Sequence, residues 1–109
     1  MKIAHINQAK LHTQANQTSL PKHYVARLER YLAFGIHPGG FIRAVLNNDL
    51  FDAIQRADAE GLKNLGVLCR LVFECLDGNA WGSRNQVDEW MEHQGYAGIV
   101  IRQAQTTSD

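Results

Sequence analysis

The sequence predicts an all-α protein: a compact bundle of about five short helices around a buried central helix at residues 62–76, with a polar N-terminal arm. Three observations predict it. Apolar residues recur at helical spacing in the first half of the chain, a nearly continuous apolar segment occupies 62–76, and helix-capping residues separate the segments. A chain of 109 residues that is 45% hydrophobic suits one domain. We divide it into an arm at 1–18, a helical domain at 19–98 and a short tail at 99–109.

The arm at 1–18 is rich in Gln, Asn, Thr and Lys, so it is predicted to be flexible or partly extended. An alternative pairs a short strand at residues 3–6 with residues 99–101, which are all β-branched. Two short strands are marginally stable by themselves, so the helical domain does not depend on them.

The first helix is predicted between Pro21, which suits a first helical turn, and Gly35, which suits a helix end. Apolar side chains form one face along it: Tyr24, Val25, Leu28, Tyr31 and Leu32. The loop GIHPGG at 35–40 then turns the chain, because proline restricts its neighbour and glycine allows positive φ. A short and largely apolar helix, FIRAVLNN, follows.

Asp49 is the predicted N-cap of an amphipathic surface helix at 50–59. Its narrow apolar stripe is predicted to face the core: Leu50, Ala53, Ile54 and Ala57. The polar residues between them are predicted to face water.

The segment 62–76 is apolar in nearly every direction around a helix axis, which is typical of the buried centre of a small bundle. Cys69 and Cys75 lie in it, about 9 Å apart along the axis at 1.5 Å per residue. This separation excludes a disulfide between them. Both are predicted to be reduced thiols that act as small apolar side chains.

Ser83 and Gln86 have the S-x-x-Q spacing of a capping box at the start of a last helix that ends at Gly95. Trp90 is predicted to face the core. Trp81 is predicted to fold back as a hydrophobic staple onto the helix that follows it. The alternative for Trp81 is a surface on which a ligand stacks.

Charge is divided unevenly although the net charge is zero. Residues 1–48 have six basic and one acidic side chain, a balance of +5, and residues 49–109 have five basic and ten acidic side chains, a balance of −5. The two halves either neutralise each other across helix faces or form separate interaction faces. The candidate basic face is Lys22, Arg27, Arg30 and Arg43, and the candidate acidic face is Asp88, Glu89 and Glu92.

The sequence has no glycine-rich phosphate loop, no H-E-x-x-H and no G-x-S-x-G motif. Its five histidines and two cysteines lack the paired spacing of a zinc site. We therefore expect no enzyme, no catalytic residue, no metal and no cofactor. No apolar run approaches the roughly 20 residues of a membrane span. No secretory signal is recognisable, so a cytoplasmic protein without a membrane partner is expected.

Several short motifs occur in a fixed order: Y-L-x-x-G-I-x-P-G-G-F at 31–41, A-V-L-x-N-D-L at 44–50, A-D at 57–58, and W-G-S at 81–83 followed by Val and Trp. With this order the chain resembles a family of small uncharacterised proteins of phages, prophages and mobile elements, over about residues 20–98. It departs from the family pattern at LDGNA, where a proline-containing segment is usual. The resemblance implies an accessory protein that acts inside a bacterial host cell, and it implies no catalytic residue.

Three functions are consistent with these observations. The leading one is a non-enzymatic module that binds a bacterial host or phage protein, for example to inhibit a defence complex. The second is nucleic-acid binding by the basic half, with a helix-turn-helix outline around the loop at 35–40. The third is a small-ligand or nucleotide-binding protein in which Trp81 stacks together with Tyr31 or Tyr96. A partly exposed apolar stripe would also allow a homodimer.

Overall fold

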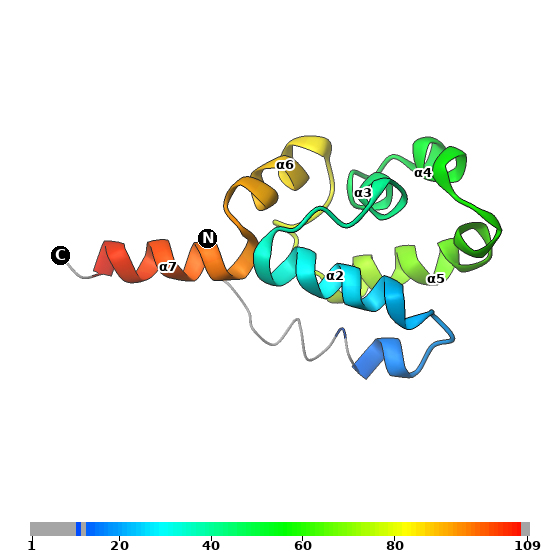
Figure 1. Ribbon diagram of the computed structural model, residues 1–109, viewed down its shortest axis with the longest axis horizontal. Coiled ribbons are helices and arrows are strands. Elements are labelled where there is room, and N and C mark those ends of the chain that lie inside the picture. Colours follow the sequence, from blue (N-terminus) through cyan, green and yellow to red (C-terminus); the bar gives the residue numbers. More distant parts are fainter. Residues whose placement is uncertain (1–10, 12, 108–109) are drawn as a thin grey trace.

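The computed structural model describes residues 11 and 13–107, with side chains as far as residue 101, and every regular element in this part of the chain is a helix. The all-α prediction is confirmed. The helices are α2 (Lys22–Phe34), α3 (Gly40–Leu46), α4 (Leu50–Arg56), α5 (Ala59–Cys75), α6 (Arg84–Glu92) and α7 (Gly95–Thr107) (Figure 1). A helical turn at residues 11 and 13–16 precedes them.

Three of the helix boundaries follow from local sequence, as predicted. Gly35 ends α2 in the left-handed conformation with a φ of 67°, and its N–H donates to the carbonyl of Tyr31. Asp49 caps α4 by accepting a hydrogen bond from the backbone N–H of Asp52. Ser83 caps α6 in the same way. These caps satisfy backbone groups that the first and last turns of a helix leave without partners.

The helices pack in two main pairs. α2 lies beside α7 and α3 lies beside α4, while α3 also contacts α5 and α6. The backbone extends 51 Å along its longest axis but only 18 Å along its shortest, the direction of view in Figure 1. Since packed helix axes are about 8–10 Å apart, the body is roughly two helices deep. A helix inside such a body cannot be enclosed on all sides.

Tyr31 of α2 lies at the centre of the core and joins three parts of the chain. Its hydroxyl donates a 2.6 Å hydrogen bond to the carbonyl of Ala80, in the segment before α6. Its own carbonyl accepts a 3.0 Å hydrogen bond from the indole Nε1 of Trp90 in α6. Trp90 is buried and lies edge-on to Tyr96 of α7, with ring centroids 5.0 Å apart. The predicted inward position of Trp90 is confirmed, and the buried Tyr31 connects α2 to α6 and to the segment before it.

The helix predicted at 62–76 is α5, which begins three residues earlier because the carboxylate of Asp58 caps it. Its prediction as a helix buried on every side is wrong: Leu62 is 52% exposed and Phe73 is 72% exposed. Its buried side chains lie mainly on one face, where the other helices cover it, and include Asn64, Leu68, Leu71, Val72 and Cys75. The shallow body leaves the opposite face in water. Neither cysteine forms a disulfide, as predicted.

The two ends of the described chain extend the core beyond the segment predicted to fold. Leu11 and Ala15, which belong to the predicted arm, are buried in the main apolar cluster. Ile99 is buried as well, and it lies in α7, which runs across the predicted boundary at residue 98. The alternative in which residues 99–101 pair as a strand is therefore wrong. Residues 1–10 and residue 12, which include its other strand, lie outside the described part.

Candidate functional site

The loop between α2 and α3 has a backbone that only glycine adopts readily at its last position. Gly39 has a φ of 95°, in the region that side chains disfavour. Its N–H donates a 3.0 Å hydrogen bond to Nδ1 of His37. Because Nδ1 accepts this bond, the proton of the neutral imidazole is on Nε2, which remains a donor. The loop thus presents His37 in a defined tautomer.

Two arginines from different helices lie against this loop. A Cβ atom at Gly39 would lie 3.4 Å from Nη1 of Arg27 in α2. A Cβ atom at Gly40 would lie only 2.9 Å from Nη1 of Arg56 in α4. The positive φ accounts for glycine at 39, whereas a side chain at 40 would require the flexible end of Arg56 to move.

The first hollow beside the loop, which we name the Arg27 hollow, has a volume of about 300 Å³. It is lined by Arg27, Arg30, Ile36, His37, Pro38 and Gly39. None of its described lining residues is acidic. Among the residues that the structure describes, neither Arg27 nor Arg30 forms an ion pair.

A second, larger hollow of about 530 Å³ shares His37 with the first, and we name it the Arg84 hollow. Three arginines line it, and two of them are paired: Arg43 with Asp88, and Arg56 with Asp52 at 3.0 Å. Arg84 has no acidic partner within the described part of the chain. The remaining lining residues are Gly40, Ala44, Asn47 and Asp49. The charges of this hollow are thus largely balanced, in contrast to the Arg27 hollow.

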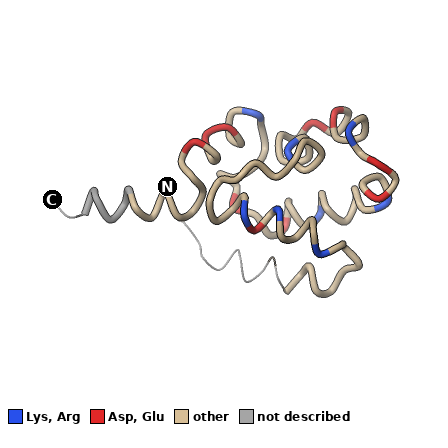
Figure 2. The backbone as a smooth tube through the Cα atoms, in the orientation of Figure 1, with Lys and Arg blue, Asp and Glu red and all other residues tan. Residues whose placement is uncertain are grey.

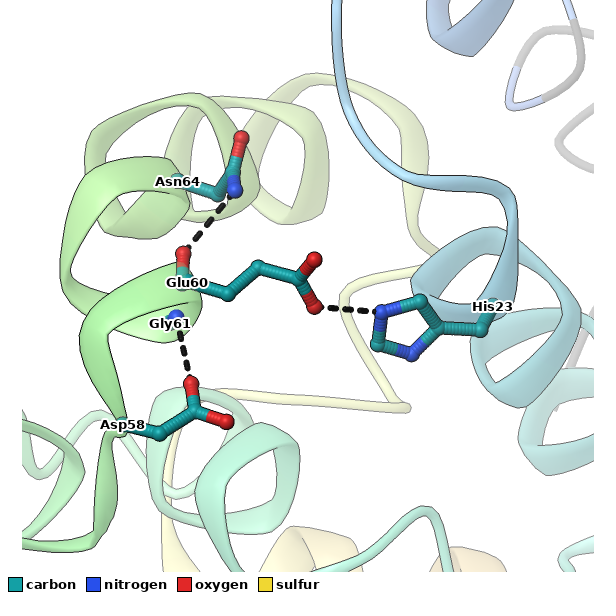
Figure 3. Close-up of polar contacts among 5 residues, drawn as sticks. All are labelled: His23, Asp58, Glu60, Gly61 and Asn64. Carbon is teal, nitrogen blue, oxygen red and sulfur yellow. Dashed lines mark hydrogen bonds and ion pairs between the residues drawn. The ribbon is translucent and has the colours of Figure 1, made fainter.

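A polar cluster links the starts of α2 and α5 (Figure 3). Nε2 of His23 lies 2.6 Å from Oε1 of Glu60, and both side chains are about half exposed. The amide of Asn64 donates to the carbonyl of Glu60, within α5. Burial raises the pKa of the nearby Tyr24, and the negative charges of Glu60 and Asp58 raise this pKa further. The cluster joins α2 to α5. We interpret the contact of His23 with Glu60 as structural.

The structure separates the four residues of the candidate basic face. Arg27 and Arg30 share the Arg27 hollow, whereas Arg43 lines the Arg84 hollow. Lys22 lines a different hollow, together with Glu29 on another side of α2. Of the four predicted residues, only Arg27 and Arg30 therefore line the same hollow.

The candidate acidic face lies on α6, where the acidic residues follow one another along the tube in Figure 2. Asp88 is hydrogen-bonded to Arg43, so a member of each predicted face is paired with the other. Glu89 and Glu92 are exposed. At this contact, the two oppositely charged halves of the sequence neutralise each other.

The capping box before α6 forms in part. The backbone N–H of Gln86 donates to Oγ of Ser83 at 3.2 Å, as predicted. The side chain of Gln86 differs from the expected pattern, because its amide donates to the carbonyl of Gly78. Trp81 contacts Phe73 of α5 edge-on, with centroids 5.9 Å apart, where the sequence predicted a staple onto α6. It thus packs on the preceding helix.

Burial bears on two binding modes that the sequence suggested: a helix-turn-helix that uses α3, and stacking of a ligand on Tyr31 or Tyr96. α3, the second helix of the helix-turn-helix outline, has most of its apolar side chains in the core, as its composition indicated. Gly40, Phe41 and Arg43 are the residues of α3 that are at least partly exposed. Tyr31 and Tyr96 are also buried, so neither ring can stack on a ligand.

α4 leaves an apolar surface in water, so the prediction that Leu50, Ala53, Ile54 and Ala57 face the core is wrong for Leu50 and Ile54. Phe51 is 84% exposed, and Leu50 and Ile54 are also exposed, while only Ala53 of this helix is buried. These three residues, at i, i+1 and i+4, form one side of the helix, and we name them the α4 apolar surface. Other large exposed apolar side chains lie elsewhere on the described chain: Phe34, Ile36, Leu62, Phe73, Val100 and Ile101.

Within the described residues, no group of three or more His, Cys, Asp or Glu side chains could hold a metal ion. No helix in this same part of the chain is long and apolar enough to cross a bilayer.

The sequence analysis did not include Arg56 and Arg84 among the candidate site residues. The glycine pair at 39–40 was the sequence feature that could have indicated a close neighbour such as Arg56. Compared with known proteins, the chain matches no protein-family model, no curated protein and no solved structure.

Proposed function

We propose that this protein is a non-enzymatic interaction module that binds another protein through the α4 apolar surface. The observation that supports the proposal most directly is the exposure of Phe51, which no neighbouring helix covers. Burying a phenylalanine side chain contributes about 1.5–3 kcal/mol to the free energy of folding. This is a large part of the stability of a small domain, so an exposed phenylalanine is costly. An exposed cluster of this kind is typical of a surface that a partner covers.

The surroundings of the α4 apolar surface also suit an interface. Asp52 and Arg56, on another side of the same helix, line the Arg84 hollow and are paired with each other. An apolar centre bordered by charged groups is the usual composition of a protein interface. Aromatic side chains near such a centre tend to contribute most of the binding energy.

For the partner, we propose a bacterial host or phage protein, since the sequence motifs resemble those of phage and mobile-element proteins. The corresponding biological role is inhibition of a protein complex of the host, such as a defence complex. A second copy of this chain is the competing occupant, and the oligomeric state of the purified protein distinguishes the two.

The test compares two exposed phenylalanines. The wild-type protein, Phe51→Ser and Phe73→Ser are each immobilised and exposed to a bacterial lysate, after light scattering has established the oligomeric state. We expect a retained partner with the wild type and with Phe73→Ser, and its loss with Phe51→Ser. Retention of no protein at about micromolar concentration, or equal retention by both variants, contradicts the proposal.

A further inference from the structure

We propose that the Arg27 hollow is a binding site for a phosphate group. The side chains of Arg27, Arg30 and His37 line this hollow, and among the described residues no carboxylate lines it. The inference concerns the side of the molecule around the loop at 35–39. It is independent of the protein contact proposed at the α4 apolar surface.

The first step of the argument is the charge arrangement. Arg27 and Arg30 are three residues apart on α2, so their side chains are neighbours on the helix surface. Two like charges at this spacing repel each other unless a counter-charge is present. The nearest acidic residue of the helix, Glu29, lines the hollow of Lys22 on another side. Asp58 lines another hollow together with Arg27, but neither Arg27 nor Arg30 forms an ion pair among the described residues. A bound anion would provide a direct ionic partner for both.

The second step is the preorganisation of one donor, the imidazole of His37, beside a buried proline. The bond from the N–H of Gly39 to Nδ1 of His37 holds the imidazole with Nε2–H as its donor. Pro38 is buried, and Nη1 of Arg27 lies close to Gly39. A site whose donors are held before the ligand arrives loses less conformational entropy on binding.

The third step is the chemistry of the ligand. A guanidinium group presents paired N–H donors that match the oxygens of a phosphate, and it keeps its charge at every physiological pH. A tetrahedral phosphate offers oxygens in several directions, so it can accept bonds from two arginines and from an imidazole on a third side. The volume of about 300 Å³ holds such a group with part of the molecule attached to it. Exposed Ile36 in the lining offers that attached part an apolar contact.

The phosphate can belong to a free phosphate compound or to a nucleic-acid strand, and the experiment separates these sources. Calorimetric titration at about 50 mM salt, where screening is weak, uses inorganic phosphate, adenosine monophosphate and a single-stranded oligonucleotide with the full chain. The variants are Arg27→Gln and Arg30→Gln. The matched control is Lys22→Gln, which removes the same charge from the same helix at a different hollow.

We expect saturable binding of at least one of these compounds, weakened at least about tenfold by Arg27→Gln or Arg30→Gln and less than about twofold by Lys22→Gln. All three side chains are exposed, so melting temperatures should stay within a few degrees of the wild type and show that each variant is folded. Binding of the oligonucleotide that is much tighter than that of the monophosphate, and that falls steeply with salt, identifies a strand as the source. Similar affinities identify a free phosphate compound.

Two results would overturn the proposal. One is the absence of saturable binding for all three compounds at millimolar concentration. The other is binding that Lys22→Gln weakens as much as the two arginine variants do, because this would show only a general attraction to positive charge. Neither result bears on the lysate experiment at α4, so the two proposals can fail separately.

Discussion

Trp90 donates its indole N–H to the backbone carbonyl of Tyr31, 59 positions earlier in the chain, at a distance of 3.0 Å. The same carbonyl also accepts the N–H of Gly35, which ends α2. The buried indole therefore completes the end of one helix from another helix. Together with the bond from the Tyr31 hydroxyl to Ala80, this contact joins α2, α6 and the segment before α6 into one unit.

Replacing Tyr31 with phenylalanine should destabilise the protein at neutral pH and make it less sensitive to alkali. The variant leaves the buried carbonyl of Ala80 without its donor, at a cost of about 1–3 kcal/mol. Burial raises the pKa of Tyr31 above its usual value, with a smaller contribution from Asp88 and an opposing one from Arg43. The unfolded chain releases this proton near pH 10, while the folded chain still holds it. The free energy of unfolding should therefore fall by up to about 1.4 kcal/mol per pH unit above this pH.

Urea denaturation of both proteins at about pH 7 and about pH 11 measures the two effects. Tyr24 also has a raised pKa and contributes to the alkaline loss in both proteins, so the difference between them reports on Tyr31. If the free energy of unfolding of Tyr31→Phe fell between about pH 7 and about pH 11 as much as that of the wild type, Tyr31 would not be a source of the alkaline loss of stability.

Gly95→Ala should destabilise the contact between α2 and α7. A Cβ atom at this position would lie 2.5 Å from the carbonyl oxygen of Leu32 and 2.7 Å from the nitrogen of Gly35, and the φ of 63° disfavours a side chain. We expect a loss of about 2–5 kcal/mol from the two effects. Thermal unfolding measures it. Gly66→Ala is the control, since a Cβ there meets nothing within 4 Å and should stabilise α5 by up to about 1 kcal/mol.

The ion pair between Arg43 and Asp88 should contribute modestly to stability and show salt dependence. A double-mutant cycle with alanine at both positions should give a coupling of about 0.5–1 kcal/mol, because both side chains are partly exposed. Raising the salt concentration to about 1 M should reduce it. The pair Asp52 and Arg56, four residues apart in α4, is the local comparison and should give about 0.3–0.5 kcal/mol. A coupling of zero for Arg43 and Asp88 would show that the two charges do not hold α3 against α6.

Cys69 should react slowly with thiol reagents in the folded protein. Partial burial raises the pKa of this thiol, because it disfavours the charged thiolate, so less thiolate is present at a given pH. At about pH 8 we expect alkylation several times slower than for an exposed cysteine of ordinary pKa. Cys75 is almost fully buried and should react only after unfolding. The same measurement in urea, where both thiols should react readily, is the control. Reaction of Cys69 at the rate of a small free thiol would refute the expected effect of burial.

The parts of the candidate site that were predictable are those within a few residues of each other. Arg27 and Arg30 were expected on one basic face from the charge distribution, and their spacing of three residues in α2 makes them neighbours on the helix surface. Arg43 was expected beside them, but α3 places it in the other hollow, opposite Asp88. Arg56 approaches Gly40 from α4, and no sequence pattern connects residues 40 and 56.

Sequence by itself determined that the segments of α2 to α6 are helical and where several of these helices end, but it did not predict the helix α7. The φ at Gly35 and the capping bonds of Asp49 and Ser83 involve residues no more than four positions apart, so local chemistry decides them. Tertiary structure alone decided which apolar faces are covered: Phe51 and Phe73 remain in water, whereas Tyr31 lies at the centre. Burial of a face depends on whether another helix is available to cover it. In a body roughly two helices deep, that depends on the whole path of the chain.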